Sequence, residues 1–275
     1  MLTHNRRSFV AGALALASPR LALPQSEGGG GFILGVASYS LRKFSRTQAI
    51  AMLKEMNVDT VSIKEFHLPY KSSKAELEAG RKEFDEAGIR VASGGVIGLT
   101  KNDDADIRMY FEYAKTCRMP MIIIAPTHET MPKIESFVKE YNIKVAIHNH
   151  GPEDKHFPAP QDALRVIKGM DRRIGVCIDA GHTVRTNTDV IKSIVEAGDR
   201  LFDMHIKDLR SLSGKDSQCA VGEGAMPIAA MFKQLRKMNY RGTVNLEYEI
   251  KADAPLPGMK ESFSYMRGVL AGLKA

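Results

Sequence analysis

The sequence has no tryptophan and only three cysteines among its 275 residues. Cys117, Cys177 and Cys219 are odd in number, and no two of them have the C-x-x-C spacing. This pattern argues against a disulfide framework and against a cysteine-ligated zinc site. Cys117 and Cys177 lie in apolar surroundings, so we expect them to be buried free thiols.

Concentrated positive charge is also missing. The formal net charge is +7, but lysine and arginine are scattered among the acids. Proteins that bind nucleic acid usually carry a basic stripe interleaved with aromatic residues, and the sequence has none. We therefore expect no nucleic-acid partner, although a mildly basic surface attracts anionic small molecules.

The apolar run near the N-terminus, Val10–Ala17, is too short to span a bilayer. It follows a twin-arginine pair, Arg6 and Arg7, and small residues come after it. Together these features predict an export signal over residues 1–25, followed by a glycine-rich linker at 26–31. We expect a periplasmic or otherwise exported protein with no membrane insertion of the mature chain. A frayed basic terminus is the alternative.

Strand-like apolar runs alternate with segments of helical spacing over residues 32–275. The predicted strands are Ile33–Ser38, Val58–Ile63, Ile89–Ser93, Met119–Ala125, Ile143–His148, Ile174–Asp179, Leu201–Ile206 and Thr243–Glu247. The predicted helices are Thr47–Met56, Ser73–Gly88, Asp106–Cys117, Lys133–Glu140, Pro160–Ile167, Asp189–Ala197, Ile228–Met238 and Glu261–Leu273. This alternation predicts an α/β protein, a single (β/α)8 TIM barrel. A doubly wound open sheet is the weaker alternative, because no Gly-x-Gly-x-x-Gly turn follows the first strand.

Histidines and acids gather where the predicted strands end. Seven of the eight histidines follow or end a strand, and the eighth lies in the predicted signal. Asp179 and Glu247 end two further strands in the same way. Because barrel active sites lie at the carboxyl ends of the strands, these side chains predict a site for one divalent cation, Mn²⁺, Zn²⁺ or Mg²⁺.

Each residue also has a plainer explanation. Asp179 could cap a turn, His205 could be a core histidine, and Glu247 could be a surface acid. His148 could lie beside a metal site without binding the ion. The combination is more informative than its members, because independent coincidences at one barrel end are improbable.

Five motifs carry a resemblance to a known family over nearly all of the chain after the linker. They are SIKEFHLP (Ser62–Pro69), AIHNHGPED (Ala146–Asp154), CIDAGHT (Cys177–Thr183), DMHIKD (Asp203–Asp208) and NLEYE (Asn245–Glu249). In this order and spacing they resemble the sugar phosphate isomerase/epimerase superfamily, the xylose isomerase-like TIM barrels. The subgroup that the chain most resembles is exported and carries a twin-arginine signal.

The resemblance implies one divalent metal ion held by four residues. They would be His148, Asp179, His205 and Glu247. Many family members have a glutamate where this chain has His148, and use two facing carboxylates to move a proton. A metal-bound imidazole is a poor proton acceptor. The HNH stretch also resembles the inosose dehydratase-like branch, whose members are lyases.

The chemistry that such a site supports suggests further roles. Glu247, or a nearby glutamate or histidine, is the expected general base, and Lys64, Lys207 and His182 are candidates for proton delivery or contact with substrate hydroxyls. The expected substrate-binding residues are His67, His150 and Glu153.

Proton abstraction next to a sugar carbonyl is the expected chemistry. The first functional hypothesis is a metal-dependent sugar isomerase or epimerase, and the alternative is a lyase or dehydratase acting on a keto-sugar or 3-keto-glycoside. A metal nuclease and a non-enzymatic sugar-binding barrel are weaker hypotheses. Lys215 and Lys251 are not joined by a glycine-rich helix start, so we expect an unphosphorylated small-molecule sugar. Homo-oligomers are common in the family.

Overall fold

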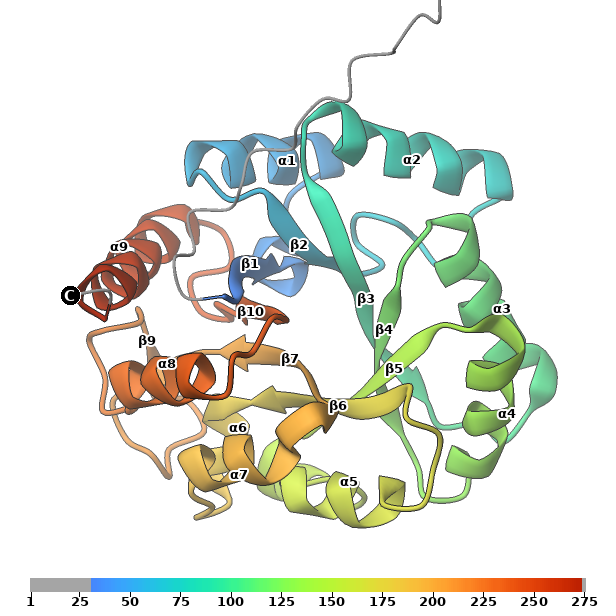
Figure 1. Ribbon diagram of the computed structural model, residues 1–275. Coiled ribbons are helices and arrows are strands. Elements are labelled where there is room, and N and C mark those ends of the chain that lie inside the picture. Colours follow the sequence, from blue (N-terminus) through green and yellow to red (C-terminus); the bar gives the residue numbers. More distant parts are fainter. Residues whose placement is uncertain (1–30, 274–275) are drawn as a thin grey trace, which may run out of the picture.

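A closed barrel of eight parallel strands forms the centre of the computed structural model, which describes residues 31–273. The strands pair in the order β1-β10-β7-β6-β5-β4-β3-β2, and helices surround them (Figure 1). This topology confirms the predicted (β/α)8 barrel. The predicted signal at 1–25 and the predicted linker, except Gly31, lie outside the described residues.

The barrel strands are β1 (Ile33–Ala37), β2 (Thr60–Ile63), β3 (Arg90–Leu99), β4 (Met121–Pro126), β5 (Lys144–His148), β6 (Ile174–Asp179), β7 (Leu201–Ile206) and β10 (Thr243–Leu246). The helices are α1 (Arg46–Glu55), α2 (Lys74–Glu86), α3 (Asp104–Thr116), α4 (Met131–Tyr141), α5 (Pro160–Ile167), α6 (Ala180–Arg185), α7 (Val190–Ala197), α8 (Ile228–Lys237) and α9 (Leu256–Gly272). Two short strands, β8 (Asp208–Leu209) and β9 (Gln218–Cys219), form a separate antiparallel pair after β7. Among the described helices, none is both long and apolar enough to cross a bilayer.

Most elements differ from their predicted bounds by at most two residues, and three larger differences have a clear cause. The strand β3 continues to Leu99 through a glycine-rich sequence. Glycine has a low strand propensity, so this sequence does not predict a strand. The helix α6 was not predicted, because six residues are too few to show a helical period. The helix α9 begins at Leu256, five residues before the predicted start, with a proline in its first turn, where the missing N–H costs nothing.

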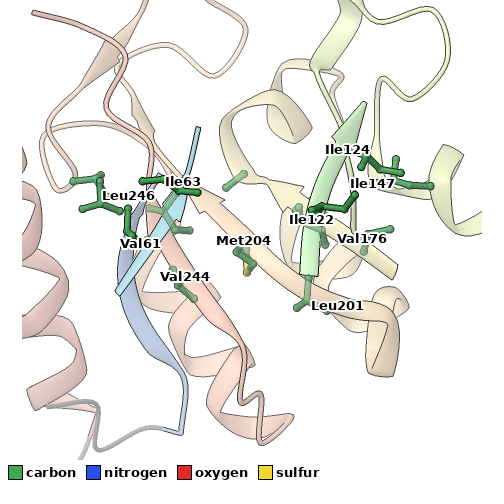
Figure 2. Packing of buried hydrophobic residues seen from close by; sticks show 14 of the residues in the cluster. Val61, Ile63, Ile122, Ile124, Ile147, Val176, Leu201, Met204, Val244 and Leu246 are labelled. Carbon is green, nitrogen blue, oxygen red and sulfur yellow. The ribbon is translucent and has the colours of Figure 1, made fainter. Parts of the chain in front are cut away.

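The barrel strands place apolar side chains outward and smaller or polar ones inward, because successive side chains point to opposite faces. On β6, Val176 and Ile178 belong to the main core between strands and helices, while Cys177 belongs to a small second cluster. Figure 2 shows Val176 with Ile147 and other outward side chains of that core. Apolar packing of these outward residues holds the barrel in shape around an interior that combines this small apolar cluster with polar side chains.

The ring closes between the first and last barrel strands. Backbone pairing joins β1 to β10, from Ile33 opposite Thr243 to Val36 opposite Leu246. Outside this pair, the Arg267 side chain of α9 donates to the Met56 carbonyl oxygen at the end of α1 at 2.8 Å. The barrel therefore depends on contacts between segments at opposite ends of the described chain.

A buried carboxylate lies inside the barrel. Asp203 is 0% exposed and accepts hydrogen bonds from the Asn245 side-chain amide at 2.7 Å and the Met204 amide at 2.7 Å. The Ser93 hydroxyl donates to its second oxygen at 3.3 Å. Burial raises the pKa of Asp203 from 3.8 to about 6, because a charged carboxylate is disfavoured away from water.

We expect Asp203→Asn to remove a pH-dependent penalty on folding. Between the unfolded pKa of 3.8 and the folded pKa of about 6, the folded state keeps a proton that the unfolded state releases. The contribution of Asp203 to wild-type stability therefore falls as the pH rises through this window. Across this pH window, the free energy of unfolding of the variant should rise relative to that of the wild type by up to about 3 kcal/mol, because one pKa unit corresponds to about 1.4 kcal/mol.

Urea unfolding of the metal-free protein across this pH range measures the difference. The control is Asp199→Asn, which changes an exposed aspartate in the 3-10 helix Gly198–Arg200, just before the same strand. A free-energy difference between Asp203→Asn and the wild type that stays constant with pH would contradict the assignment.

Candidate metal centre

Four side chains meet where β5, β6, β7 and β10 end. His148 and Asp179 are the last residues of β5 and β6, and Asp179 lies opposite His205 of β7 in the parallel register. Glu247 directly follows β10, and its backbone N–H donates to the Ile206 carbonyl oxygen at 2.9 Å. One ligand atom from each of the four lies within 4.8 Å of the others. The register of the sheet brings the backbones of these four residues to the same end of the barrel.

The spacing of the four ligand atoms suits a single ion. His148 Nε2 is 3.1 Å from His205 Nδ1, which is 3.2 Å from Glu247 Oε2. His148 Nε2 is also 3.5 Å from Asp179 Oδ2. Ligand atoms around a bound Zn²⁺ or Mg²⁺ are roughly 3.0–3.4 Å apart when the metal–ligand bonds are about 2.0–2.1 Å.

Burial of the four residues makes an unfilled site costly. All four are at most 5% exposed, and Asp179 Oδ2 lies 3.0 Å from the Lys207 ammonium. Buried carboxylates that outnumber the positive charges beside them are disfavoured unless a further cation balances them. Two imidazoles and two carboxylates are also a donor set that Mn²⁺, Zn²⁺ and Mg²⁺ accept to different degrees. The residues therefore fit a divalent cation.

Lys207 provides the positive charge within the site. Its ammonium is 3.0 Å from Asp179 Oδ2, 3.0 Å from Glu247 Oε2 and 3.2 Å from Glu249 Oε1. Burial acts to lower the pKa of Lys207, but Asp179 and Glu247 raise it well above its usual range. Lys207 is therefore protonated, and its ammonium group can donate hydrogen bonds. Three carboxylates against one ammonium leave two negative charges, which one divalent cation would balance.

The two carboxylate ligands are ionised. Burial acts to raise the pKa of Asp179, but His182 and Lys207 hold it well below its usual range. Burial has the same effect on Glu247, and Lys207 and His205 hold the pKa of that carboxyl well below its usual range. Both groups are therefore ready to bind a cation without losing a proton.

The two imidazole ligands differ in their protonation. Burial and the neighbouring His150 lower the pKa of His148 to about 3, so this ring is neutral. Burial also acts to lower the pKa of His205, but Cys177 and Glu247 raise it well above its usual range. Since a metal ligand must be unprotonated, binding of a cation would displace a proton from His205.

Asp179 has two roles at once. Its Oδ2 faces the site, while its Oδ1 accepts from the His182 backbone N–H at 2.7 Å and caps the N-terminus of α6. The Asn149 side chain accepts from the Asp179 backbone N–H at 3.0 Å and donates to Thr183 Oγ1 at 3.1 Å. The turn-capping explanation of Asp179 is thus correct, and it also fixes the direction of the other oxygen.

Three other predicted site residues lie beside the four. The His150 ring centroid is 4.4 Å from that of His148, and the His182 centroid is 6.0 Å from His148. Glu153, in the 3-10 helix η2 (Gly151–Glu153), forms an ion pair with Arg185 of α6. These loops form one wall of the site.

The structure does not bring the other two predicted residues to the four ligands. The His67 ring is 1% exposed, and its Nε2 lies 3.2 Å from the Leu41 carbonyl oxygen, which indicates a packing role. The Lys64 ammonium donates to the Val96 carbonyl oxygen at 2.8 Å, on the β2–β3 side of the barrel. Whether these two side chains contact the site depends on the direction in which they point, and the order of the strands does not predict that direction.

Sequence reasoning missed three residues of the site. Glu249 contacts Lys207, and Arg185 contacts His182 at 3.1 Å between guanidinium and Nδ1. The Gln218 amide of β9 donates to the Glu247 carbonyl oxygen at 2.7 Å and accepts from the Glu249 N–H at 3.0 Å. Glu249 stood in a recognised motif. Neither Arg185 nor Gln218 gave any local signal, since their contacts are made across loops.

We expect His148→Ala to weaken binding of Mn²⁺ or Zn²⁺ by more than about 100-fold, because loss of a direct ligand should cost more than loss of an outer partner. Asp179→Asn should also weaken binding, because it replaces a charged oxygen ligand with a neutral amide oxygen. Asparagine also caps helices well, so Asp179→Asn should keep α6 intact. Titration calorimetry with a competing chelator measures the affinity. In the wild type, metal at 100-fold over its Kd should raise the unfolding free energy by about 2.7 kcal/mol.

The matched control is His128→Ala. His128 is exposed, and its Nε2 lies 3.1 Å from the His156 carbonyl oxygen, outside the four ligands. The metal affinity of the His128→Ala variant should equal that of the wild type. Equal metal binding by His148→Ala and the wild type would rule out this centre.

A family model connects the chain to known proteins. The model of the xylose isomerase-like TIM barrel matches residues 50–269. A protein of Methanocaldococcus jannaschii that is described as uncharacterized is 22% identical over 137 residues, which cover 48% of this chain and 46% of the relative. The chain therefore matches about half the length of that curated relative.

Solved structures share the fold. The apo form of 3-keto-D-glucoside 4-epimerase from E. coli has a TM-score of 0.71 at 18% identity, with 86% of this chain and 99% of that chain covered. A protein described as the probable 3-DHS dehydratase of petrobactin synthesis from Bacillus anthracis has a TM-score of 0.69 at 11% identity, with 86% and 98% covered. At these identities, the likeness shows the fold alone.

Proposed function

The chain belongs to the xylose isomerase-like TIM barrel family, and from this membership we propose that it is a divalent-metal-dependent sugar isomerase or epimerase. The observation that carries the proposal is the convergence of His148, Asp179, His205 and Glu247 at the carboxyl end of the barrel. The reaction begins with removal of a proton next to a sugar carbonyl. When bound, a divalent cation supplies Lewis-acid polarisation of that carbonyl.

The side chains around the ligands supply the proton transfers. Burial raises the pKa of Glu249, whereas that of Glu247 is held low, so Glu249 has the more basic carboxylate of the two. Glu247 or Glu249 accepts the proton from carbon. The Lys207 ammonium, held by both carboxylates, stabilises negative charge that develops on a substrate oxygen.

His148 favours a second candidate, a lyase or dehydratase that acts on a keto-sugar or 3-keto-glycoside. In many relatives, a glutamate at this position would form the second base of a facing pair. Here the residue is an imidazole whose Nε2 points at the other ligands and whose pKa burial lowers to about 3. Elimination needs one base and one acid, and therefore does not need the missing carboxylate.

The proposal includes an unphosphorylated substrate and export of the enzyme. The twin-arginine pair Arg6 and Arg7, followed by the apolar run Val10–Ala17, supports export. The lack of a glycine-rich phosphate-binding turn after the last two strands supports a sugar without phosphate.

The test is incubation of the Mn²⁺-loaded protein in D₂O with free ketoses, aldoses and 3-keto-glycosides, followed by NMR. We expect deuterium at one carbon and a rearranged sugar. An unsaturated keto-sugar or a released aglycone would instead support the lyase. Glu247→Gln should lower turnover by at least about 100-fold, because a general base contributes about that much.

Glu55→Gln is the matched control. Glu55 is an exposed acid at the end of α1 that pairs with Lys260, and its variant should turn over substrate as the wild type does. Absence of turnover of every sugar by protein that has bound its metal would contradict the proposed function.

A further inference from the structure

The Arg185 guanidinium contacts the ring of His182 inside the protein. Its NH1 lies 3.1 Å from His182 Nδ1, and the side chain is 7% exposed. The other terminal nitrogen donates to Glu153 in η2. A Cβ built on Gly151 would lie 3.3 Å from both Arg185 NH1 and His182 Nδ1, so glycine leaves room for this contact.

This contact determines which nitrogen of His182 carries the proton. A guanidinium has five N–H donors and no acceptor, and it stays charged at all physiological pH values. His182 Nδ1 must therefore accept the hydrogen bond and cannot hold a proton. A neutral imidazole has a single N–H, which then lies on Nε2. A doubly protonated ring would place an N–H against the guanidinium, so Arg185 also disfavours the imidazolium.

Nearby contacts hold both partners in place. The backbone N–H of His182 donates to Asp179 Oδ1 at 2.7 Å, at the start of the same short helix that ends with Arg185. Glu153 holds the guanidinium from the loop after β5. The His182 ring is 5.9 Å from that of His150 and 6.0 Å from that of His148, between centroids. Its Nε2 has no hydrogen-bond partner in the described part of the chain.

His150 has the opposite arrangement. Its Nδ1 is 3.4 Å from Asp154 Oδ2, and an ionised carboxylate only accepts hydrogen bonds. The backbone N–H groups of His156 and Phe157 hold the other Asp154 oxygen at 2.8 and 3.1 Å. Nδ1 of His150 therefore faces a hydrogen-bond acceptor, whereas Nδ1 of His182 faces a donor. The neighbouring acids Glu153 and Asp154 give the two imidazoles these different surroundings, one through an arginine and one directly.

We propose that Arg185 is a positioning residue that holds His182 in the tautomer protonated on Nε2, so that His182 donates a hydrogen bond to a substrate oxygen. The proposal rests on the proposed function only for the identity of that oxygen, the carbonyl or hydroxyl of a sugar. His182 then serves as a donor to developing negative charge and does not act as a proton acceptor at Nε2.

The test is heteronuclear NMR of protein labelled with ¹⁵N-histidine and loaded with diamagnetic Zn²⁺, with His182 signals assigned through His182→Gln. We expect an unprotonated Nδ1 and a protonated Nε2. The charge-swap variant Glu153→Arg/Arg185→Glu keeps an ion pair but places an acceptor against Nδ1, so its His182 tautomer should invert. Arg185→Lys, which can only donate, should keep the wild-type tautomer.

The matched control swaps an exposed ion pair that touches no histidine, Arg210→Glu/Glu223→Arg, and should leave His182 unchanged. His150 is an internal reference whose tautomer should stay the same in all variants. Once a substrate is known, Arg185→Met should lower kcat at least about tenfold while the metal content stays constant. Loss of a residue that orients a functional side chain typically has an effect of this size.

The NMR result does not depend on finding a substrate, so its failure is distinct from failure of the proposed function. A proton on Nδ1 of His182 in the wild type, on its own or together with one on Nε2, would overturn the proposal. So would a charge-swap variant that folds and keeps the wild-type tautomer. An unchanged kcat in the Arg185→Met variant would show that Arg185 has no role in turnover.

Discussion

The parallel register of four neighbouring strands is the constraint on which the rest of this structure depends. Because Asp179 lies opposite His205, and Glu247 bonds to the strand that carries His205, the ligands need no loop to bring them together. Side chains alternate along each strand, so the residues that turn inward at the site are separated from the apolar residues that pack outward. Stability and chemistry thus come from opposite faces of the same strands.

Charge balance is the second determinant of the site. Lys207 lies among three carboxylates in a region that water scarcely reaches, and each carboxylate keeps the ammonium protonated. Removing one partner from such a buried group leaves an uncompensated charge, which is far more costly than loss of a surface ion pair. Folding of this part of the barrel and the candidate metal centre therefore depend on the same small set of charges.

Sequence reasoning predicted the fold and the clustering of four candidate ligands for a common reason. Residues such as His148 and Asp179 end apolar runs, and a barrel brings all strand ends to one place, so their position along the chain predicts their position in space. His67 and Arg185 show where this logic stops. The first points its ring at a backbone carbonyl, and the second reaches across a loop to His182. Neither outcome depends on residue order, because each follows from side-chain packing.

Pairing of β1 with β10 has a consequence for biosynthesis. The first strand waits unpaired on one edge until the last strand of the barrel has been made, and Glu247 emerges only after that last strand. During synthesis, the chain therefore has neither a closed barrel nor the complete four-residue cluster until β10 and Glu247 have left the ribosome. Closure of the ring and completion of the cluster are thus late events of folding that depend on the same segment.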